Sequence, residues 1–270
     1  MNNKTFICTL FSSSYGNCTY IKNKGEEYLI DAGVSARALE HSLNDLGTSL
    51  ANINAIFVTH EHSDHVKGLE TISKNYKIPV FAPKPCCDEM GMNSVHIPLC
   101  LNRLESPGSV EFPETSFASF STPHDALASC GYVVDLGEMK FGFATDMGYI
   151  TKNAARELSS CKAVIIESNH DIDMLKNGPY PYRLKKRILS DYGHLSNSAC
   201  ADFLPYLVLN GTNSVVLAHL SVENNTPAVA YAESCNSLKS RGMTVCTGET
   251  PGDVCLSVAP KQGVCVLIDE

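Results

Sequence analysis

Seven consecutive residues, Thr59-His60-Glu61-His62-Ser63-Asp64-His65, hold three histidines and two carboxylates. The residues before them, Ala55–Val58, are apolar and partly β-branched, which predicts a short buried strand. After them, apolar side chains recur at spacings of three and four as far as Tyr76, which predicts a helix beginning at or near Asp64. The motif therefore lies on a strand-to-helix loop, where several side chains can converge on one point.

The spacing within this loop is typical of metal ligands. His60 and His62 are two residues apart, so on an extended segment they point to the same side. Asp64 and His65 lie at the turn into the helix and can face a second point nearby. Imidazole and carboxylate groups are ligands for divalent ions, so the loop can supply half the ligands of a pair of metal ions.

Composition narrows the class of protein. A chain of 270 residues with 44% hydrophobic residues can build the core of one large domain or two small ones. No apolar run approaches the roughly 20 residues that span a bilayer, and Met1–Lys4 lacks the features of a secretory signal. We therefore expect a cytoplasmic protein without a membrane partner. The net charge of −8 excludes a uniformly basic surface but leaves room for a local basic patch.

The twelve cysteines are scattered, without a Cys-x-x-Cys pair. In a chain of this size without a signal segment, this pattern favours free cysteines in core strands and helices over disulfides or a structural zinc site.

Polar residues repeatedly follow apolar strand patterns along the chain: Asp31, His60, His124, Asp146, Glu167 and His219. At one edge of a two-sheet core they would gather into one cleft, whereas His41 and His96 lie outside these loops. A buried Asp31 needs a partner, and a metal-bound histidine is a natural one; a surface turn is the alternative. Strands and helices alternate without a repeat or linker, which predicts one domain of two sheets faced by helices.

Three further segments allow predictions of local structure or of substrate binding. Pro181–Tyr192 predicts a basic helix with Arg183, Lys185, Lys186 and Arg187, either a solvated face or a track for nucleic-acid phosphates. Ser12–Asn17 is either an ordinary serine-rich turn or a loop whose backbone approaches a phosphate. Met243–Thr247 predicts the first of three closing strands.

In this order, the motifs resemble the metallo-β-lactamase superfamily over essentially the whole chain. His60-x-His62-x-Asp64-His65 is similar to its signature motif, and His124, Asp146 and His219 are similar to its later ligands. The resemblance implies an α/β (α+β) fold, a four-layer αββα sandwich, as a single domain over residues 1–270. Asp146 and His219 are only 73 positions apart, so the β-CASP insertion of some relatives is absent.

The resemblance also implies two divalent metal ions (Mn, Zn or Fe) and their ligands. It assigns His60, His62 and His124 to one ion, Asp64, His65 and His219 to the other, and Asp146 as the bridge. Many β-lactamases of this fold have a cysteine in the second site. The imidazole and carboxylate set of this chain favours the phosphoesterase side of the superfamily.

Six finer motifs resemble the bacterial YycJ (WalJ) branch: residues 13–18, 122–125, 144–148, 167–171, 193–197 and 217–221. That branch implies 5′→3′ exonuclease activity on DNA and a role in DNA repair. Glu167 and His194 are similar to the Glu and His of ribonuclease Z. This implies that Asp64 orients the nucleophile and that His194, held by Glu167, either donates a proton to the leaving oxygen or stabilises the charged transition state. A helix-capping role is the alternative for His194.

Candidate substrate contacts are Asn17, Asn169, His170, Lys185 and Lys186. The leading hypothesis is a dinuclear metal-dependent nuclease with DNA as partner and no obligatory protein partner. The alternatives are a hydrolase of small phosphodiesters or thioesters and a non-catalytic regulatory partner. The intact ligand set argues against the non-catalytic alternative.

Overall fold

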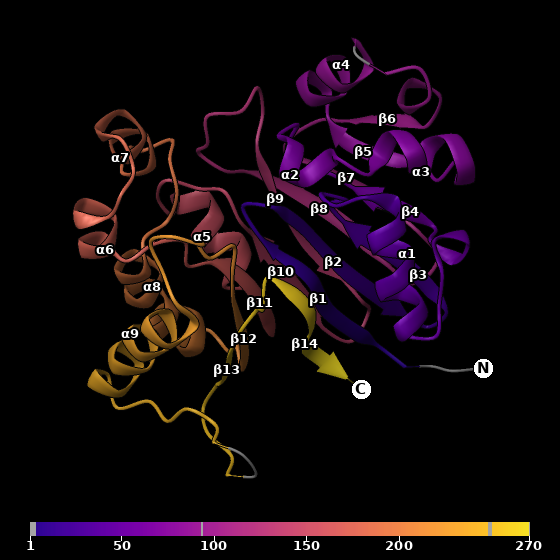
Figure 1. The fold of residues 1–270 in the computed structure, drawn as a ribbon. Helices are drawn as coiled ribbons and strands as arrows, with labels where there is room; N and C mark the ends of the chain where they lie inside the picture. The colour runs from indigo at the N-terminus through magenta and orange to yellow at the C-terminus, as the bar shows by residue number, and fades with distance from the viewer. Residues whose placement is uncertain (1–3, 93, 248–249, 270) are drawn as a thin grey trace.

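The computed structural model describes residues 4–92, 94–247 and 250–269. In this part of the chain two sheets lie face to face, and helices cover the outer face of each (Figure 1). The layer order is helix, sheet, sheet, helix. This confirms the predicted αββα sandwich.

The first sheet combines antiparallel and parallel strands. Its spatial order is β14 (Gln262–Asp269), β1 (Phe6–Ser13), β2 (Gly16–Asn23), β3 (Glu26–Ile30), β4 (Ala55–Phe57), β5 (Val80–Pro83) and β6 (Leu101–Leu104). Strands β14 to β3 pair antiparallel, whereas β3 to β6 pair parallel. The hairpin between β2 and β3 turns at Lys24-Gly25, both with positive φ, as its Asn-Lys-Gly sequence predicts.

The second sheet mirrors this arrangement. Its spatial order is β13 (Cys255–Val258), β12 (Ser214–Ala218), β11 (Ala163–Glu167), β10 (Lys140–Ala144), β9 (Cys130–Asp135), β8 (Ser116–Ser121) and β7 (Gly108–Glu111). Strands β7 to β10 pair antiparallel and β10 to β13 pair parallel. The predicted antiparallel series is therefore confirmed.

Helices divide between the two outer faces. On the side of the first sheet are α1 (Ala36–Asp45), η1 (Leu50–Asn52), α2 (Ser63–Val66), α3 (Leu69–Tyr76), α4 (Lys84–Met92) and η2 (Ile97–Leu99). On the other side are α5 (Lys152–Leu158), α6 (Ile172–Asn177), α7 (Tyr182–Ile188), α8 (Asn197–Leu209) and α9 (Pro227–Ser240). None of the helices in the described ranges has both the length and the apolar character that crossing a membrane requires.

Aromatic rings join the two sheets in the central core. Phe57 of β4 stacks on Phe117 of β8, with ring centroids 3.7 Å apart, and on Phe81 of β5, at 5.1 Å. Tyr28 and Tyr132 meet the ring of Phe57 edge-on. The packing fixes the edges of the two sheets relative to each other, because buried aromatic pairs prefer defined geometries.

The helix predicted to run from Asp64 to Tyr76 is divided at Lys67-Gly68 into α2 and α3. The N–H of Gly68 donates to the carbonyl of Ala32 at 2.8 Å. A Cβ at Gly68 would lie 2.5 Å from the carbonyl oxygen of Val34. The close approach of the loop after β3 therefore interrupts the helix.

The predicted basic helix over Pro181–Tyr192 is also shorter, because α7 ends at Ile188. The chain folds back onto the carbonyl end of α7, where the N–H of His194 donates to Ile188 O at 3.1 Å. A Cβ at Gly193 would lie 2.1 Å from the same oxygen. This return brings His194 to the sheet edge.

The expectation that the cysteines are free is wrong for one pair. Cys246 and Cys255 form a disulfide, with Cα atoms 4.8 Å apart. The predicted strand over Met243–Thr247 is reduced to isolated bridges, one of which pairs Val245 with Val254 and brings the two cysteines together. The other ten cysteines are free and mostly buried, as predicted.

Candidate metal centre

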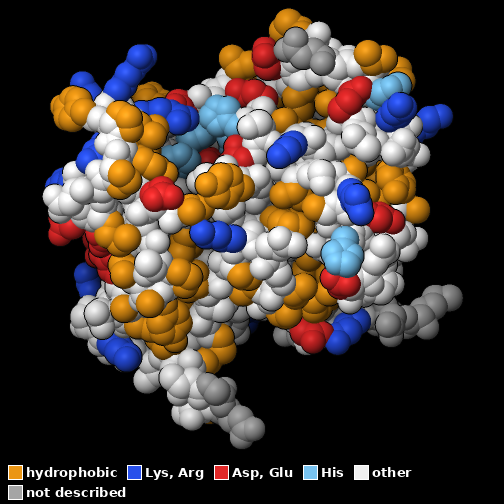
Figure 2. All heavy atoms as spheres, viewed as in Figure 1, with side chains coloured by type: hydrophobic (Ala, Val, Ile, Leu, Met, Phe, Trp, Pro, Cys, Tyr) orange, Lys and Arg blue, Asp and Glu red, His pale blue; other side chains and the backbone are white. Residues whose placement is uncertain are grey.

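Polar residues from both sheets meet where the parallel strands end. Asp31 and His60 follow β3 and β4, and His124 and Asp146 follow β8 and β10. Glu167 ends β11, and His219 follows β12. The side chains of His62, Asp64, His124, Asp146 and His219 line a cavity of about 250 Å³. Figure 2 shows pale blue histidines in a hollow of the surface.

Three of these strand-end residues have left-handed backbone conformations. The φ angles are 62° at Asp31, 57° at Asp146 and 55° at His219. Non-glycine residues seldom adopt this region, and those that do are common at functional sites. The conformation ends each strand in a sharp turn, so that the side chain stays at the sheet edge.

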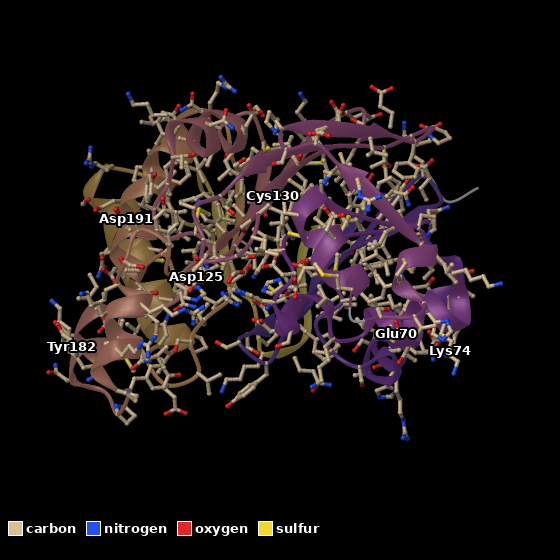
Figure 3. The ribbon with its side chains drawn as sticks, turned by 90° about the horizontal axis from the view of Figure 1, so that it is seen from above. Glu70, Lys74, Asp125, Cys130, Tyr182 and Asp191 are labelled. Atoms are coloured by element: carbon tan, nitrogen blue, oxygen red, sulfur yellow. A yellow bond between two sulfur atoms is a disulfide. The ribbon has the colours of Figure 1, made fainter. Side chains whose placement is uncertain are left out.

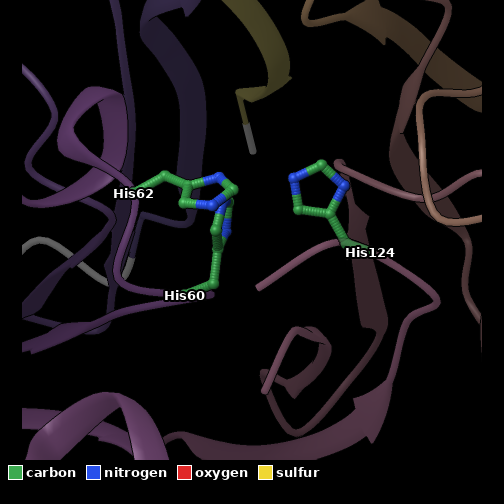
Figure 4. Close-up of side chains that lie close together, drawn as sticks. All are labelled: His60, His62 and His124. Carbon is green, nitrogen blue, oxygen red and sulfur yellow. The ribbon is translucent and has the colours of Figure 1, made fainter. Parts of the chain in front are cut away.

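Two groups of side chains offer ligand atoms within 4.8 Å of one another. His60, His62 and His124 form the first group, and Asp64, His65 and His219 form the second. Figure 4 shows His60 and His62 together, with the ring of His124 facing them. Asp146 belongs to further groups with His60 and His65 and with His219, so its carboxylate lies between the first two groups.

Each buried histidine of these groups has its Nδ1 atom held by the protein. The partners are Thr59 Oγ1 for His60 (3.0 Å), Asp31 Oδ2 for His65 (2.7 Å), Gly193 O for His124 (3.0 Å) and Glu167 Oε1 for His219 (2.9 Å). In His60, His124 and His219 the Nε2 atom is thereby left as the free ring nitrogen, which is the arrangement seen in metal-binding histidines, whereas Nε2 of His65 lies 3.2 Å from Asn17 Nδ2. Asp31 is buried against His65, as predicted, and does not lie on a surface turn.

Buried polar atoms without hydrogen-bond partners test whether the donors fit a metal. In the described part of the chain, Nε2 of His60, His124 and His219 and Oδ2 of Asp146 have none. Leaving such atoms unpaired is costly. Divalent cations held by the two groups would satisfy all four atoms, so the residues present fit the metal centre that the fold family implies.

The pKa of each buried group in the centre is set by burial together with the neighbouring charges. Burial raises the pKa of Asp64, but the neighbouring imidazoles of His219 and His65 outweigh burial and hold it well below its usual range. Burial lowers the pKa of His65, yet Asp31 and Asp146 raise it to about 10. Burial, together with the neighbouring histidines, lowers the pKa of His60. Asp64 is therefore ionised and His60 neutral at neutral pH, whereas His65 would release its proton when a metal ion binds, because a ligating imidazole must be neutral.

Glu167 is fully buried and orients two histidines at once. Its Oε1 accepts hydrogen bonds from Nδ1 of His194 at 2.8 Å and of His219 at 2.9 Å. Its Oε2 accepts from the backbone N–H groups of Met147 and Leu195. Every lone-pair direction of this carboxylate faces the protein, so Glu167 positions side chains and does not reach the cavity.

The predicted substrate contacts divide into three groups. Asn169 lines the cavity and donates to His219 O at 2.8 Å. Asn17 and His170 are buried behind the wall, and the Nδ2 atom of Asn17 lies 3.3 Å from Asp64 O. Lys185 and Lys186 lie on the outer surface of α7, where Lys185 Nζ donates to Lys176 O.

One wall of the cavity comes from residues that the sequence did not place at the site, and among them Arg187 was predicted only as part of the basic helix. Tyr180, Leu184, Arg187 and Ile188 line it, and Arg187 Nη2 donates to Asp125 Oδ1 at 2.8 Å. The spacing of three and four residues from Leu184 to Arg187 and Ile188 puts them on one helical face. This spacing could have indicated from the sequence that Arg187, unlike its basic neighbours, lies on the same helical face as Leu184 and Ile188.

Fold and site together define a metal-dependent hydrolase, and a family model identifies its class. The model of the beta-lactamase superfamily domain matches residues 26–220, and the chain belongs to that superfamily.

Relatives narrow this to the YycJ (WalJ) branch. Exodeoxyribonuclease YycJ of Bacillus anthracis is 34% identical over 237 residues, which cover 87% of this chain and 90% of the relative. Exodeoxyribonuclease WalJ of Streptococcus pneumoniae serotype 2 is 32% identical over 240 residues, covering 87% and 89%. The metallo-β-lactamase fold protein YhfI of Bacillus subtilis shares the fold, with a TM-score of 0.69 at 9% identity over 97% of this chain and 99% of that one.

Replacing Glu167 with Gln should weaken metal binding, because His194 and His219 lose their charged acceptor. Loss of such an outer carboxylate typically costs about 10–100-fold in metal affinity. Competition with a chelating dye for Zn²⁺ and Mn²⁺ measures the effect. Glu138→Gln, which changes an exposed carboxylate, is the matched control, and equal affinities for the two variants would contradict the role of Glu167.

Removing the buried imidazole of His170 should reduce the loss of folding stability as the pH falls from neutral to mildly acidic. Burial lowers the pKa of His170 from 6.5 to about 4, so the unfolded chain binds a proton that the folded chain does not. The stabilisation is fully present above pH 6.5 and is lost as the pH falls towards 4. Between pH 7 and 5, wild type should lose about 2 kcal/mol more than His170→Gln.

Urea unfolding at both pH values, under identical metal conditions, measures this difference. His41→Gln, at a histidine whose side chain is 76% exposed, should follow wild type. A His170→Gln variant with the pH dependence of wild type would show that His170 does not titrate in this window.

Proposed function

We propose that this chain is a dinuclear metal-dependent phosphodiesterase that acts as a 5′→3′ exonuclease on DNA, in DNA repair and in the cytoplasm. The observation that carries the proposal is His194, held by Glu167 and lining the same cavity as the candidate ligands. Identity of 34% to an exodeoxyribonuclease over most of both chains supports the choice of substrate. Residues 1–270 are taken as one catalytic domain, without a β-CASP insertion and without an obligatory protein partner.

The proposed ligands are the residues of the two groups and the carboxylate between them. His60, His62 and His124 would hold one ion (Mn, Zn or Fe), Asp64, His65 and His219 would hold the other, and Asp146 would contribute to both. Bound there, the ions supply Lewis-acid stabilisation of the negative charge on a phosphoryl group.

The chain's own groups supply the orientation and the proton. Asp64, whose side chain is 22% exposed, stays ionised and can accept a hydrogen bond from the attacking water. The Nδ1 atom of His194 donates to Glu167, which leaves Nε2 to give a proton to the leaving oxygen. The guanidinium of Arg187 and the amide of Asn169 line the cavity, where both can donate to phosphate oxygens.

Metal-reconstituted protein should degrade end-labelled duplex DNA, and Asp64→Ala should reduce the rate at least about 100-fold, as loss of an active-site electrostatic group does. Asp202→Ala, at an exposed position on α8, is the control. Substrates with blocked 5′ or 3′ ends test the polarity, and blocking the 5′ end should stop digestion. Absence of cleavage with Mn²⁺, Zn²⁺ and Fe²⁺ would favour the hydrolase of small phosphodiesters or thioesters instead.

Reversing the charge of Lys185 and Lys186 should weaken DNA binding and lower its salt dependence. Each lost phosphate contact reduces the slope of log affinity against log salt by about 0.9 on duplex DNA. Lys74→Glu with Lys239→Glu, at two exposed positions elsewhere, makes the same change in net charge. Nuclease activity that matches this control over a salt series would remove Lys185 and Lys186 from the proposed phosphate track.

A further inference from the structure

A second cavity lies beside the metal centre, on the other side of the hairpin between β1 and β2. Ser14 of this hairpin lines the metal cavity, whereas Ser13, Tyr15 and Gly16 line the second one, which has a volume of about 360 Å³. Its apolar lining comes from Phe11, Val34 and Ala38. A volume above about 300 Å³ is typical of small-ligand sites.

The charged groups that line this cavity are both positive. They are Lys67 and Lys261, and both are exposed. Across the described ranges neither forms a salt bridge, and no carboxylate lines the cavity. The cavity therefore complements an anion in a protein whose net charge is −8.

Both lysines are anchored to elements that build the metal centre. Lys67 ends the short helix that carries Asp64 and His65. The carbonyl of Lys261 accepts a hydrogen bond from the N–H of Ser12, and the hydroxyl of Ser12 accepts one from the N–H of His219 at 2.7 Å. The backbone of both lysines thus has a fixed position relative to the proposed reaction site.

An exposed aromatic ring stands between the two cavities. Tyr15 is 71% exposed at the tip of the hairpin, and its backbone N–H donates to Ser13 Oγ, which steadies the turn. Exposed aromatic rings beside basic groups are the usual platforms on which unpaired nucleobases stack.

We propose that the second cavity binds the nucleotide next to the scissile phosphodiester, in a single-stranded end of the substrate. The base stacks on Tyr15 over the apolar lining, and the adjoining phosphate pairs with Lys67 and Lys261. A single strand is required because paired bases do not expose their faces for stacking. This inference rests on the proposed nuclease function and adds a binding subsite to it.

Fluorescence anisotropy of a labelled eight-nucleotide oligothymidylate, with a phosphorothioate backbone that resists cleavage, tests the subsite in metal-loaded protein. Lys67→Ala with Lys261→Ala should weaken binding about tenfold and lower the salt slope by about 0.7, since the two lysines pair with one phosphate and a single strand loses about 0.7 per neutralised phosphate. Tyr15→Ala should weaken binding about tenfold without changing that slope, and Tyr15→Phe should bind like wild type because its ring still stacks.

Lys74→Ala with Lys239→Ala removes the same charge away from the cavity and should bind like wild type. Neither lysine lines the cavity, and Figure 3 places Lys74 at the outer edge of the molecule. Variants of Lys67, Lys261 and Tyr15 that match this control would overturn the subsite.

The two proposals fail in different ways. If wild type cleaves DNA and the subsite variants behave as the control does, only the subsite is wrong. If metal-loaded wild type neither binds the octanucleotide nor cleaves DNA, the proposed nuclease function and the subsite fall together.

Discussion

The site depends on hydrogen bonds between buried carboxylates and imidazole Nδ1 atoms. Asp31 and Glu167 end parallel strands in different sheets, and each is removed from solvent. Burying a carboxylate costs several kcal/mol unless it is paired, and here histidines and backbone N–H groups provide the pairing. Since each pair fixes both the tautomer and the direction of a ring, the Nε2 atoms that face the cavity are set before any metal binds.

The sandwich makes this arrangement possible because it brings together the carboxyl ends of strands from two sheets. Phe57 and Phe117 stack directly across the interface, so the strand before His60 and the strand before His124 have a fixed relative position. A change in inter-sheet packing would separate ligands that are far apart in sequence. The metal centre is therefore a property of the central core as much as of the loops that carry its side chains.

Much of the fold and of the candidate site follows from local patterns. Apolar strands ending in Asp31, His60, Asp146, Glu167 and His219 predicted both the sheets and the edge where the polar residues meet. The missed features depend on contacts between separate segments. Carbonyl groups after β3 divide the helix at Gly68. The backbone pairing of Val245 with Val254 brings Cys246 and Cys255 together as a disulfide. The orientation of Arg187 into the cavity likewise depends on how α7 packs, which its basic composition does not indicate.

The left-handed backbone at Asp31, Asp146 and His219 limits which sequences this site can tolerate. At each position the residue must carry a particular polar group and also accept a conformation that disfavours most side chains. Glycine and asparagine satisfy the backbone without supplying the charge or the imidazole. Exchange at these strand ends would therefore relax the chain while removing its chemistry, so that stability and activity oppose each other at the same three residues.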